Sequence, residues 1–149
     1  MLSDRYKYDK KETIELNKLQ HKIRDSAIYK LESGEYKLEK VKCLCGGSDF
    51  KKLAEKDRYG LPVETVICSN CGLVSTNPRM TQDSYNKFYD YEYRRLYVGR
   101  DEPDEQFIYE QYCHGEQIYE FVKSFIKCDA RILEIGCGAG GILKFFKEK

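Results

Sequence analysis

The sequence has no long apolar run and no tryptophan, and it has only three prolines. A membrane-spanning helix requires about 18 or more consecutive, mostly apolar residues, so the sequence predicts none. Residues 1–8 are polar and lack the apolar centre of a secretory signal peptide. We therefore expect a cytoplasmic protein that has no membrane partner.

An excess of charge of either sign is also absent, because 26 basic residues are balanced by 25 acidic ones and the net charge is +1. A nucleic-acid-binding surface usually needs a clear basic excess or a basic stripe. One region is rich in lysine, but acidic residues offset much of its charge. The lysines are Lys37, Lys40, Lys42, Lys51, Lys52 and Lys56, and the acidic residues are Glu35, Glu39, Asp49, Glu55 and Asp57. We expect a solvated surface here and no nucleic-acid partner.

The chain does have seven cysteines, and without a secretory signal these are expected to be thiols or metal ligands rather than disulfides. Four of them form two close pairs, Cys43 with Cys45 and Cys68 with Cys71, and a glycine follows each pair. Zinc is commonly held by four such sulfurs in a tetrahedron. The pattern predicts the two knuckles of a zinc ribbon. Four protein ligands leave no open position on the metal, so we expect a structural Zn²⁺.

The first cysteine pair has only one residue between its cysteines, so its knuckle must be tighter than the usual one with two. The alternative for the whole cluster is four buried thiols without a metal. Cys113 and Cys128 are expected to be small buried or half-buried residues. His21 and His114 lie far from the cysteine pairs in the sequence, and we expect ordinary surface or packing roles for both.

The rest of the pattern predicts helices on both sides of this ribbon. Thr13 and Thr81 are the expected N-caps of two helices, and Gly34 is the expected stop of the first. In chain order we expect a loose segment (1–10), a helix (13–31), strands (50–53, 63–68 and 73–74) with a turn at 57–60, a short helix (82–89), a linker (90–103) and a long helix (104–127). Tyr85, Phe88 and Tyr89 would form the apolar face of the short helix.

A second motif lies in residues 131–143. The pattern predicts a buried strand over 132–135, a glycine-rich turn over 136–141 and a helix from Ile142 onward. Glycines allow the backbone to turn tightly and to approach a ligand, and the N-terminus of a helix presents unpaired N–H groups. Such a turn between a strand and a helix is typical of a cofactor-binding site.

Glu134 discriminates between cofactors. It lies two positions before Gly136, at the carboxyl end of the expected strand, where ligands bind in open α/β sheets. A carboxylate there disfavours the pyrophosphate of a nicotinamide or flavin cofactor, although the glycine spacing alone permits one. S-adenosylmethionine carries a sulfonium and an ammonium group and has no phosphate, so it suits this position.

The stretch Glu134-Ile-Gly136-Cys137-Gly138-Ala-Gly140 resembles the first motif of class I S-adenosylmethionine-dependent methyltransferases. The resemblance implies a seven-stranded α/β fold in the complete protein. It implies that Glu134 lies near the methionine end of the cofactor, and that the backbone at Gly136, Cys137, Gly138 and Gly140 lines it. In this family an acidic residue about 20 positions after the glycines holds the ribose hydroxyls. That position lies beyond residue 149, as do the expected catalytic residues.

The order of the parts is similar to that of methyltransferases with an N-terminal zinc-binding region, several of which act on sugars or polysaccharides. The resemblance thus implies a small-molecule or glycan substrate. The expected fold is an α+β fragment with an N-terminal helix, a small zinc ribbon, a helical connector and the first β-α unit of a Rossmann-like domain. Its parts are a helical segment (1–36), a zinc-ribbon-like module (37–80), a short helix with a linker (81–103), and a long helix with the start of the cofactor domain (104–149).

This interpretation carries two further expectations. The 149-residue chain alone should be inactive, and residues 130–149 should be loosely held or docked on the preceding helix, because a lone strand has no parallel neighbour. The alternative function is a zinc-dependent module that binds protein or nucleic acid without catalysis.

Overall fold

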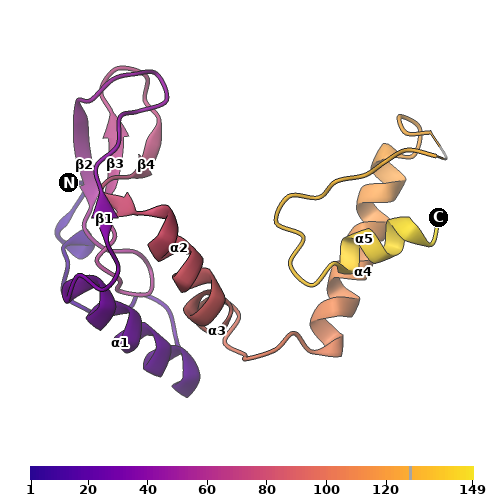
Figure 1. The fold of residues 1–149 in the computed structure, drawn as a ribbon, viewed down its shortest axis with the longest axis horizontal. Helices are drawn as coiled ribbons and strands as arrows, with labels where there is room; N and C mark the ends of the chain where they lie inside the picture. The colour runs from indigo at the N-terminus through magenta and orange to yellow at the C-terminus, as the bar shows by residue number, and fades with distance from the viewer. Residues whose placement is uncertain (128) are drawn as a thin grey trace. The chain divides into compact units, whose positions relative to one another are not determined.

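The computed structural model describes residues 1–127 and 129–149. The chain divides into two compact units, Met1–Asp101 and Glu102–Lys149 (Figure 1). Its fold is mixed α and β, with helices and small antiparallel sheets, which confirms the coarse fold prediction. None of the described helices is long and apolar enough to cross a membrane.

The first long helix, α1, spans Lys18–Glu32. Its N-cap is Asn17, whose side chain accepts a hydrogen bond from the backbone N–H of Gln20, while the Gln20 side chain accepts one from Asn17. This capping box satisfies two N–H groups at the first turn. The helix therefore begins at Lys18, and the start predicted at Thr13 is wrong. The predicted stop is confirmed, because Gly34 follows the helix with a φ of +77°, which favours glycine.

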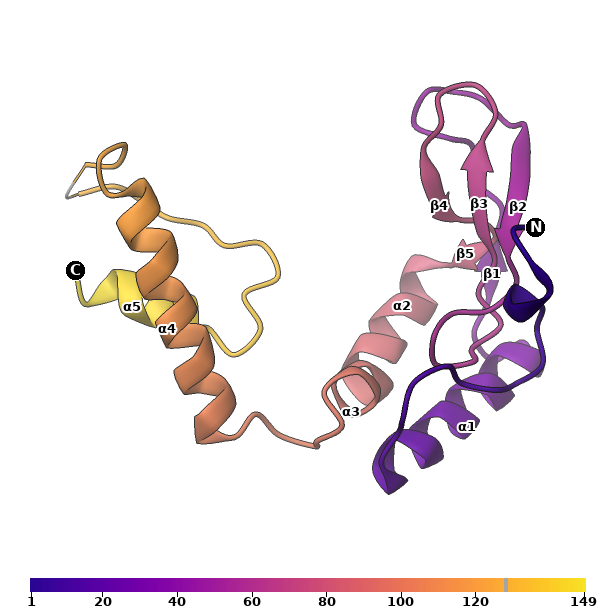
Figure 2. The same ribbon diagram turned by 180° about the vertical axis from the view of Figure 1, so that it is seen from behind.

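Two antiparallel sheets follow α1 along the chain. β2 (Phe50–Ala54), β3 (Thr65–Cys68) and β4 (Val74–Thr76) form a three-stranded sheet in the order β2-β3-β4, seen from behind in Figure 2. The short strands β1 (Leu38–Glu39) and β5 (Arg79–Met80) form a separate pair. The three strands predicted for the ribbon are therefore confirmed, within one or two residues at their ends.

The ribbon, residues 42–76, is joined to the helical part of its unit at two adjacent points. Leu38 pairs with Met80 in the β1–β5 ladder. Just inside this pair, the Asn77 side chain accepts a hydrogen bond from Val41 N–H (3.2 Å) and donates one to the Val41 carbonyl (3.0 Å). The peptide bond between Asn77 and Pro78 is cis. Residues 42–76 are thus closed into one loop by backbone and side-chain hydrogen bonds.

The loop between β2 and β3 inserts into the helical part. The Asp57 carboxylate accepts hydrogen bonds from the backbone N–H groups of Tyr59 and Leu61, both at 2.9 Å, and Gly60 N–H donates to the Asp57 carbonyl (3.1 Å). These bonds form the turn predicted at 57–60. Tyr59 and Leu61 are each only 2% exposed. The hairpin therefore carries two of the most buried side chains of the unit.

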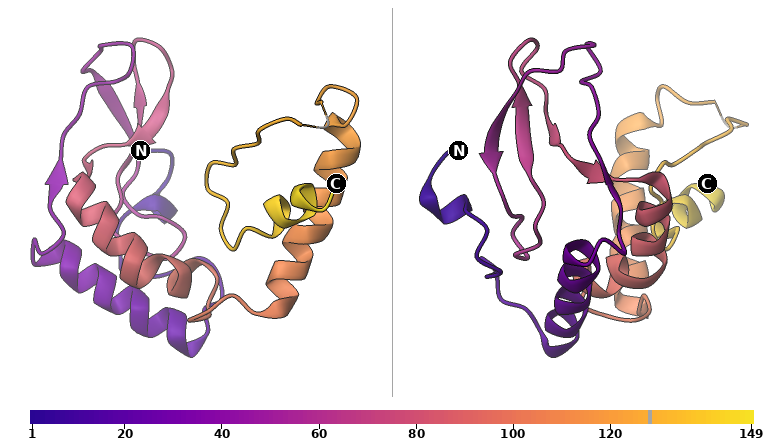
Figure 3. Two further views of the ribbon diagram at one scale, coloured as in Figure 1. Left: turned by 45° about the vertical axis from the view of Figure 1, so that its right-hand side comes forward. Right: turned by 60° about the vertical axis from the view of Figure 1, so that its left-hand side comes forward.

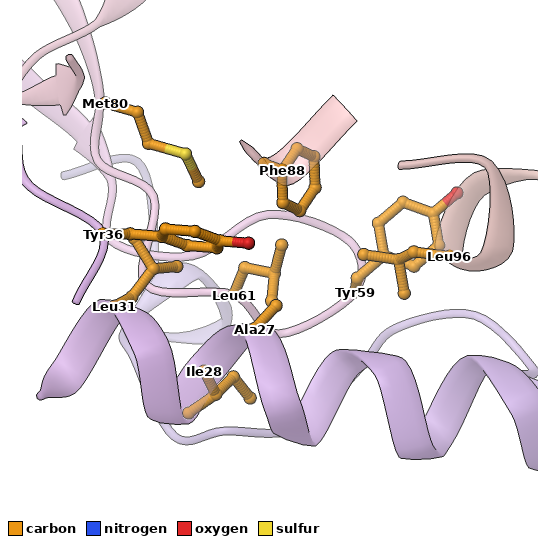
Figure 4. Close-up of a cluster of buried hydrophobic side chains, with 9 residues drawn as sticks. All are labelled: Ala27, Ile28, Leu31, Tyr36, Tyr59, Leu61, Met80, Phe88 and Leu96. Atoms are coloured by element: carbon orange, nitrogen blue, oxygen red, sulfur yellow. The ribbon is translucent and has the colours of Figure 1, made fainter. Parts of the chain in front are cut away.

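These two side chains belong to the hydrophobic core, which Figure 4 shows in close-up. The core contains side chains from α1, the segment between α1 and β1, the β2–β3 loop, β5, α2 and α3. Its members are Ala27, Ile28, Leu31, Tyr36, Tyr59, Leu61, Met80, Phe88 and Leu96. Burial of apolar side chains drives this packing. Because the core contains residues of the β2–β3 loop and of the helices, it joins the ribbon to the helices. The views in Figure 3 show α1 running beside the segment that contains α2 and α3.

The predicted linker at 90–103 is largely helical in the structure. α2 (Gln82–Phe88) continues directly into a π-helical turn, η2 (Tyr89–Tyr93), and then into α3 (Arg94–Tyr97). Leu96 in α3 is fully buried. The sequence prediction failed here because charged and tyrosine residues dominate the stretch. The helix is stabilised by the burial of Leu96 in the core, which is a tertiary contact. Tyr89, predicted for the apolar face of α2, is 56% exposed.

The predicted loose segment 1–10 is also wrong. It contains a short 3₁₀ helix, Asp4–Tyr6, and its backbone is tied to the ribbon. Leu2 N–H donates to the Leu53 carbonyl (3.0 Å), and Glu55 N–H donates to the Tyr6 carbonyl (2.9 Å). Backbone pairing of this kind leaves no periodic signal in a polar sequence, so it could not be predicted.

The second unit, residues 102–149, contains α4 (Glu105–Val122) and α5 (Gly141–Lys147). Asp104 caps α4, because its side chain accepts a hydrogen bond from Phe107 N–H (2.9 Å). The long predicted helix is confirmed, but it ends at residue 122 rather than 127. α5 packs against α4, so this part of residues 130–149, which were predicted to be loosely held or docked, is docked on the preceding helix.

The predicted strand at 132–135 is not formed, because residues 129–149, all of which the structure describes, contain no paired strand. Leu133 is 86% exposed and Ile135 is 93% exposed. A strand needs a neighbour to satisfy its backbone groups, and the unit offers none among its described residues. The Rossmann-like unit is therefore not confirmed.

Candidate metal centre and glycine-rich turn

The structure brings the four predicted cysteines together. The sulfurs of Cys43, Cys45, Cys68 and Cys71 all lie within 4.8 Å of one another. Two sulfur–sulfur contacts join the two knuckles, at 3.5 Å for Cys43 with Cys71 and 3.8 Å for Cys45 with Cys68. Zinc–sulfur bonds of about 2.3 Å in a tetrahedron place sulfurs about 3.8 Å apart. The spacing therefore fits a metal ion with four thiolate ligands.

The sheet register positions the second knuckle. Phe50 pairs with Cys68, which places that cysteine at the end of β3. The backbone then turns back, because Gly72 N–H donates to the Cys68 carbonyl and Cys68 N–H donates to the Leu73 carbonyl, both at 2.9 Å. Gly72 has a φ of +76°, a conformation that glycine adopts without strain. Cys71 lies within this turn and is exposed.

The first knuckle is tight, as its single intervening residue predicts. Gly46 N–H donates to the Cys43 carbonyl, and Cys43 N–H donates to the Gly47 carbonyl, both at 2.8 Å. Gly46 has a φ of +84°. A Cβ atom at Gly47 would lie 3.4 Å from the sulfurs of Cys45 and Cys68. The glycine pair therefore makes room for a short knuckle that closes directly over the sulfurs.

The four thiols differ in environment. Cys43 and Cys68 are buried, whereas Cys45 and Cys71 are exposed. The Asn70 side chain donates a hydrogen bond to the Cys45 sulfur at 3.5 Å. This bond, together with the backbone N–H of Gly47, lowers the pKa of Cys45 to about 6. These hydrogen bonds therefore favour the thiolate form of Cys45.

Cys43 titrates in the opposite direction. The backbone N–H of Cys45 favours the thiolate of Cys43, but desolvation and hydrogen bonds with the other sulfurs outweigh it. Together these effects raise the pKa of Cys43 to about 12. A divalent cation would have to displace the proton from this thiol, because the thiolate is the form that binds metal.

Cys113, Cys137 and both histidines lie outside this cluster. Cys113 and Cys137 are half-buried, and Cys128 lies outside the described residues. His21 approaches Glu12 at 3.8 Å, and His114 is exposed on α4. Among the described residues, the four paired cysteines are the only group of this kind with metal-ligand spacing.

The glycine-rich turn has the backbone that its glycines predict. Gly136, Gly138 and Gly140 have φ values of +77°, +57° and +77°. Gly140 N–H donates to the Cys137 carbonyl (2.8 Å), and α5 begins at the next residue. The predicted helix start at Ile142 is thus confirmed within one residue. A Cβ atom at Gly136 or Gly140 would meet nothing within 4 Å, so the turn is open on that side.

A residue that the motif did not indicate also contacts this turn. The Gln111 side chain, from α4, accepts a hydrogen bond from Gly141 N–H at 3.3 Å. Its amide nitrogen lies so close to Gly138 that a Cβ atom there would be 2.9 Å away. Gln111 could not be found from the sequence, because this contact depends on how α4 and α5 pack.

Glu134 lies at an apolar groove. One of its carboxylate oxygens is buried and has no hydrogen-bond partner among the described residues. The groove has a volume of about 290 Å³, and its other lining residues are Ile118, Val122, Ile126, Ile132, Leu133, Ile142, Leu143 and Phe146. A buried carboxylate oxygen without a partner is unfavourable. A cationic or hydrogen-bond-donating group beside Glu134 would remove this penalty.

Comparison with known proteins gives no relative for this chain. No family model matches it, and neither a curated protein nor a solved structure matches it. Function must therefore be inferred from the two sites themselves.

Proposed function

We propose that the four cysteines bind one structural Zn²⁺, and that the chain is the N-terminal part of an S-adenosylmethionine-dependent methyltransferase. The zinc proposal rests on one observation, the four sulfurs within 4.8 Å of one another. The methyltransferase proposal rests on Glu134 followed by three left-handed glycines and a helix. The 149-residue chain alone is expected to be inactive.

Four thiolates support a structural rather than a catalytic metal. They fill a tetrahedron, so the metal has no position for water or substrate. Zn²⁺ is the ion that such a sulfur set suits best in a reducing compartment. Its role would be to join the two knuckles, because Cys43 contacts Cys71 and Cys45 contacts Cys68 across them.

The environment of Glu134 supports a cationic cofactor at the turn. Its buried oxygen needs a partner, and its groove is otherwise apolar. S-adenosylmethionine would supply positive charge there, and a pyrophosphate would add negative charge. When bound, the cofactor supplies a methyl group that passes to a substrate nucleophile by in-line displacement. The residues of this chain would hold and orient the donor, which is a large part of such catalysis. The methyl acceptor that we propose is a sugar or a polysaccharide-related molecule.

Calorimetric titration of the complete encoded protein tests the cofactor proposal. The gene is first read past codon 149, where a frame of about 150 or more further residues would complete a cofactor domain. We expect S-adenosylmethionine to bind and NAD⁺ and FAD not to bind. Glu134→Gln should weaken S-adenosylmethionine about tenfold, since a charged hydrogen bond contributes about 1.5–3 kcal/mol. The control is Glu116→Gln, which changes an exposed residue of α4. Binding of NAD⁺ or FAD instead would overturn the proposal.

A second candidate is a zinc-dependent module that binds another macromolecule without catalysis. One observation favours it: residues 1–101 form a unit with its own core and the whole cysteine cluster. A protein partner is the better choice, because the lysines beside the ribbon are interleaved with acidic residues, and Lys52 is paired with Glu64 at 3.0 Å. A complete protein that takes up zinc but binds no S-adenosylmethionine would support this candidate.

A further inference from the structure

The metal cluster has a buried half and an exposed half. Cys43 and Cys68 are buried, and Cys45 and Cys71 are exposed. A metal held by four thiolates leaves a protein by stepwise replacement of its ligands. We therefore expect a competing ligand from solution to begin at one of the two exposed cysteines.

Asn70 contacts one of these exposed cysteines. Its side-chain nitrogen is 3.5 Å from the Cys45 sulfur, within the range of an N–H···S hydrogen bond. Asn70 belongs to the second knuckle and Cys45 to the first, so this bond crosses the cluster. A Cβ atom at Gly47 would lie 3.3 Å from the Asn70 Cβ, which shows how closely the two knuckles approach at this point.

We infer that Asn70 is a positioning residue that holds Cys45 on the metal and slows its replacement. The amide donates to a sulfur that keeps negative charge when it binds Zn²⁺, so the hydrogen bond persists in the loaded site. Asn70 also ties the short first knuckle to the longer second one. This inference rests on the proposed zinc site and adds to it a residue that controls metal exchange.

Transfer of zinc from the full chain to an excess of a chromogenic chelator measures this role. Asn70→Ala and Asn70→Leu should both speed transfer about tenfold, the low end for partners of metal ligands, because Asn70 is exposed to water. Leucine keeps the bulk of asparagine but cannot donate a hydrogen bond. Slow transfer from Asn70→Leu would mean that bulk alone protects Cys45, and it would overturn the inference.

Two variants serve as controls. Ser69→Ala lies in the same knuckle and keeps the backbone N–H that donates to the Asp49 carbonyl (3.0 Å). Leu44→Ala lies in the first knuckle, where the side chain is 95% exposed. Both should release zinc at the rate of the unaltered chain. An equal acceleration in Ser69→Ala would show a general loosening of the knuckle and would overturn the role of Asn70.

Replacing Zn²⁺ by Co²⁺ gives a second measurement, one that would not change if Asn70 had only a structural role. The thiolate-to-cobalt charge-transfer band should shift in Asn70→Leu and remain in place in Ser69→Ala, because a hydrogen bond withdraws charge from the Cys45 sulfur. An unshifted band together with an unchanged transfer rate in Asn70→Leu would overturn the role of Asn70 but not the zinc proposal. Failure of the unaltered chain to take up either Zn²⁺ or Co²⁺ would instead overturn the zinc proposal.

Discussion

At the scale of single residues, one buried acid is held by two partners from a distant part of the sequence. Glu92 is 2% exposed and lies in the π-helical turn η2. Its two oxygens accept hydrogen bonds from the Tyr36 hydroxyl and the Lys30 ammonium group, both at 2.5 Å. A buried carboxylate is tolerated only when it is paired in this way. The triad therefore joins η2 to α1 and to the segment that follows α1.

We predict that Glu92→Ala lowers the free energy of unfolding by about 3 kcal/mol, because it leaves a buried hydroxyl and a partly buried ammonium group without their partner. Glu92→Gln should have a smaller effect, since its amide oxygen still accepts a hydrogen bond. Urea unfolding followed by circular dichroism measures both. Equal stability of the alanine variant and the unaltered chain would show that the triad adds nothing.

Asp57 gives a prediction for pH dependence. Burial raises its pKa above the ordinary value of 3.8, although the N–H groups of Leu61 and Tyr59 and the charge of Arg58 act in the other direction. A carboxyl whose pKa is raised by folding stabilises the fold below its unfolded pKa and loses that contribution as pH rises through the folded pKa. At neutral pH the ionised Asp57 is therefore unfavourable.

Asp57→Asn should raise the urea midpoint at pH 7, because an asparagine oxygen can accept the same two backbone hydrogen bonds without being charged. The gain over the unaltered chain should shrink as pH falls through the acidic range. Measuring the difference between the two chains cancels any loss of metal that both share. A variant less stable than the unaltered chain at pH 7 would contradict the expected sign.

At the scale of elements, two glycines set the packing of α5 on α4. A Cβ atom at Gly141 would lie 2.6 Å from the Gln111 Cβ and 2.7 Å from the Ile108 carbonyl oxygen. A Cβ atom at Gly115 would lie 2.8 Å from the Phe145 Cβ. One glycine from each helix thus allows the two backbones to approach closely.

Gly141→Ala should separate the two helices, because the clash involves backbone atoms that cannot rotate away. Overpacking of this kind typically destabilises by about 1–3 kcal/mol. Hydrogen exchange of the α5 amides should become faster, whereas Gln117→Ala, at an exposed position of α4, should leave it unchanged. Unchanged exchange in Gly141→Ala would contradict the close packing.

The elements also show what the sequence could predict. Helices α1 and α4, the ribbon strands and the four clustered cysteines follow from periodicity and spacing, which are local signals, although the first residue of α1 does not. Three features could not be predicted locally. Residues 1–10 are ordered by backbone pairing, the 90–97 segment is helical because Leu96 is buried, and residues 132–135 lack a neighbour to form a strand. Asn70 and Gln111 were missed because each contacts its site across two packed segments.

At the scale of the whole molecule, we expect the metal to stabilise the unit of residues 1–101 and not the unit of residues 102–149. The knuckles lie at one end of the ribbon, and the loop with Tyr59 and Leu61 at its other end fills the helical core (Figures 1 and 4). Loss of the metal should therefore loosen the sheet and then this core. All four cysteines belong to residues 1–101, so α4 and α5 have no residue in the site.

Native mass spectrometry of the full chain, combined with hydrogen exchange before and after chelation, tests the central claim directly. We predict one zinc ion per chain, lost in Cys68→Ser and kept in Cys113→Ser. Chelation should speed exchange in β2, β3 and the 57–63 loop but not in α4. A chain that holds no metal after reconstitution with Zn²⁺, or that keeps its zinc in Cys68→Ser, would contradict the account.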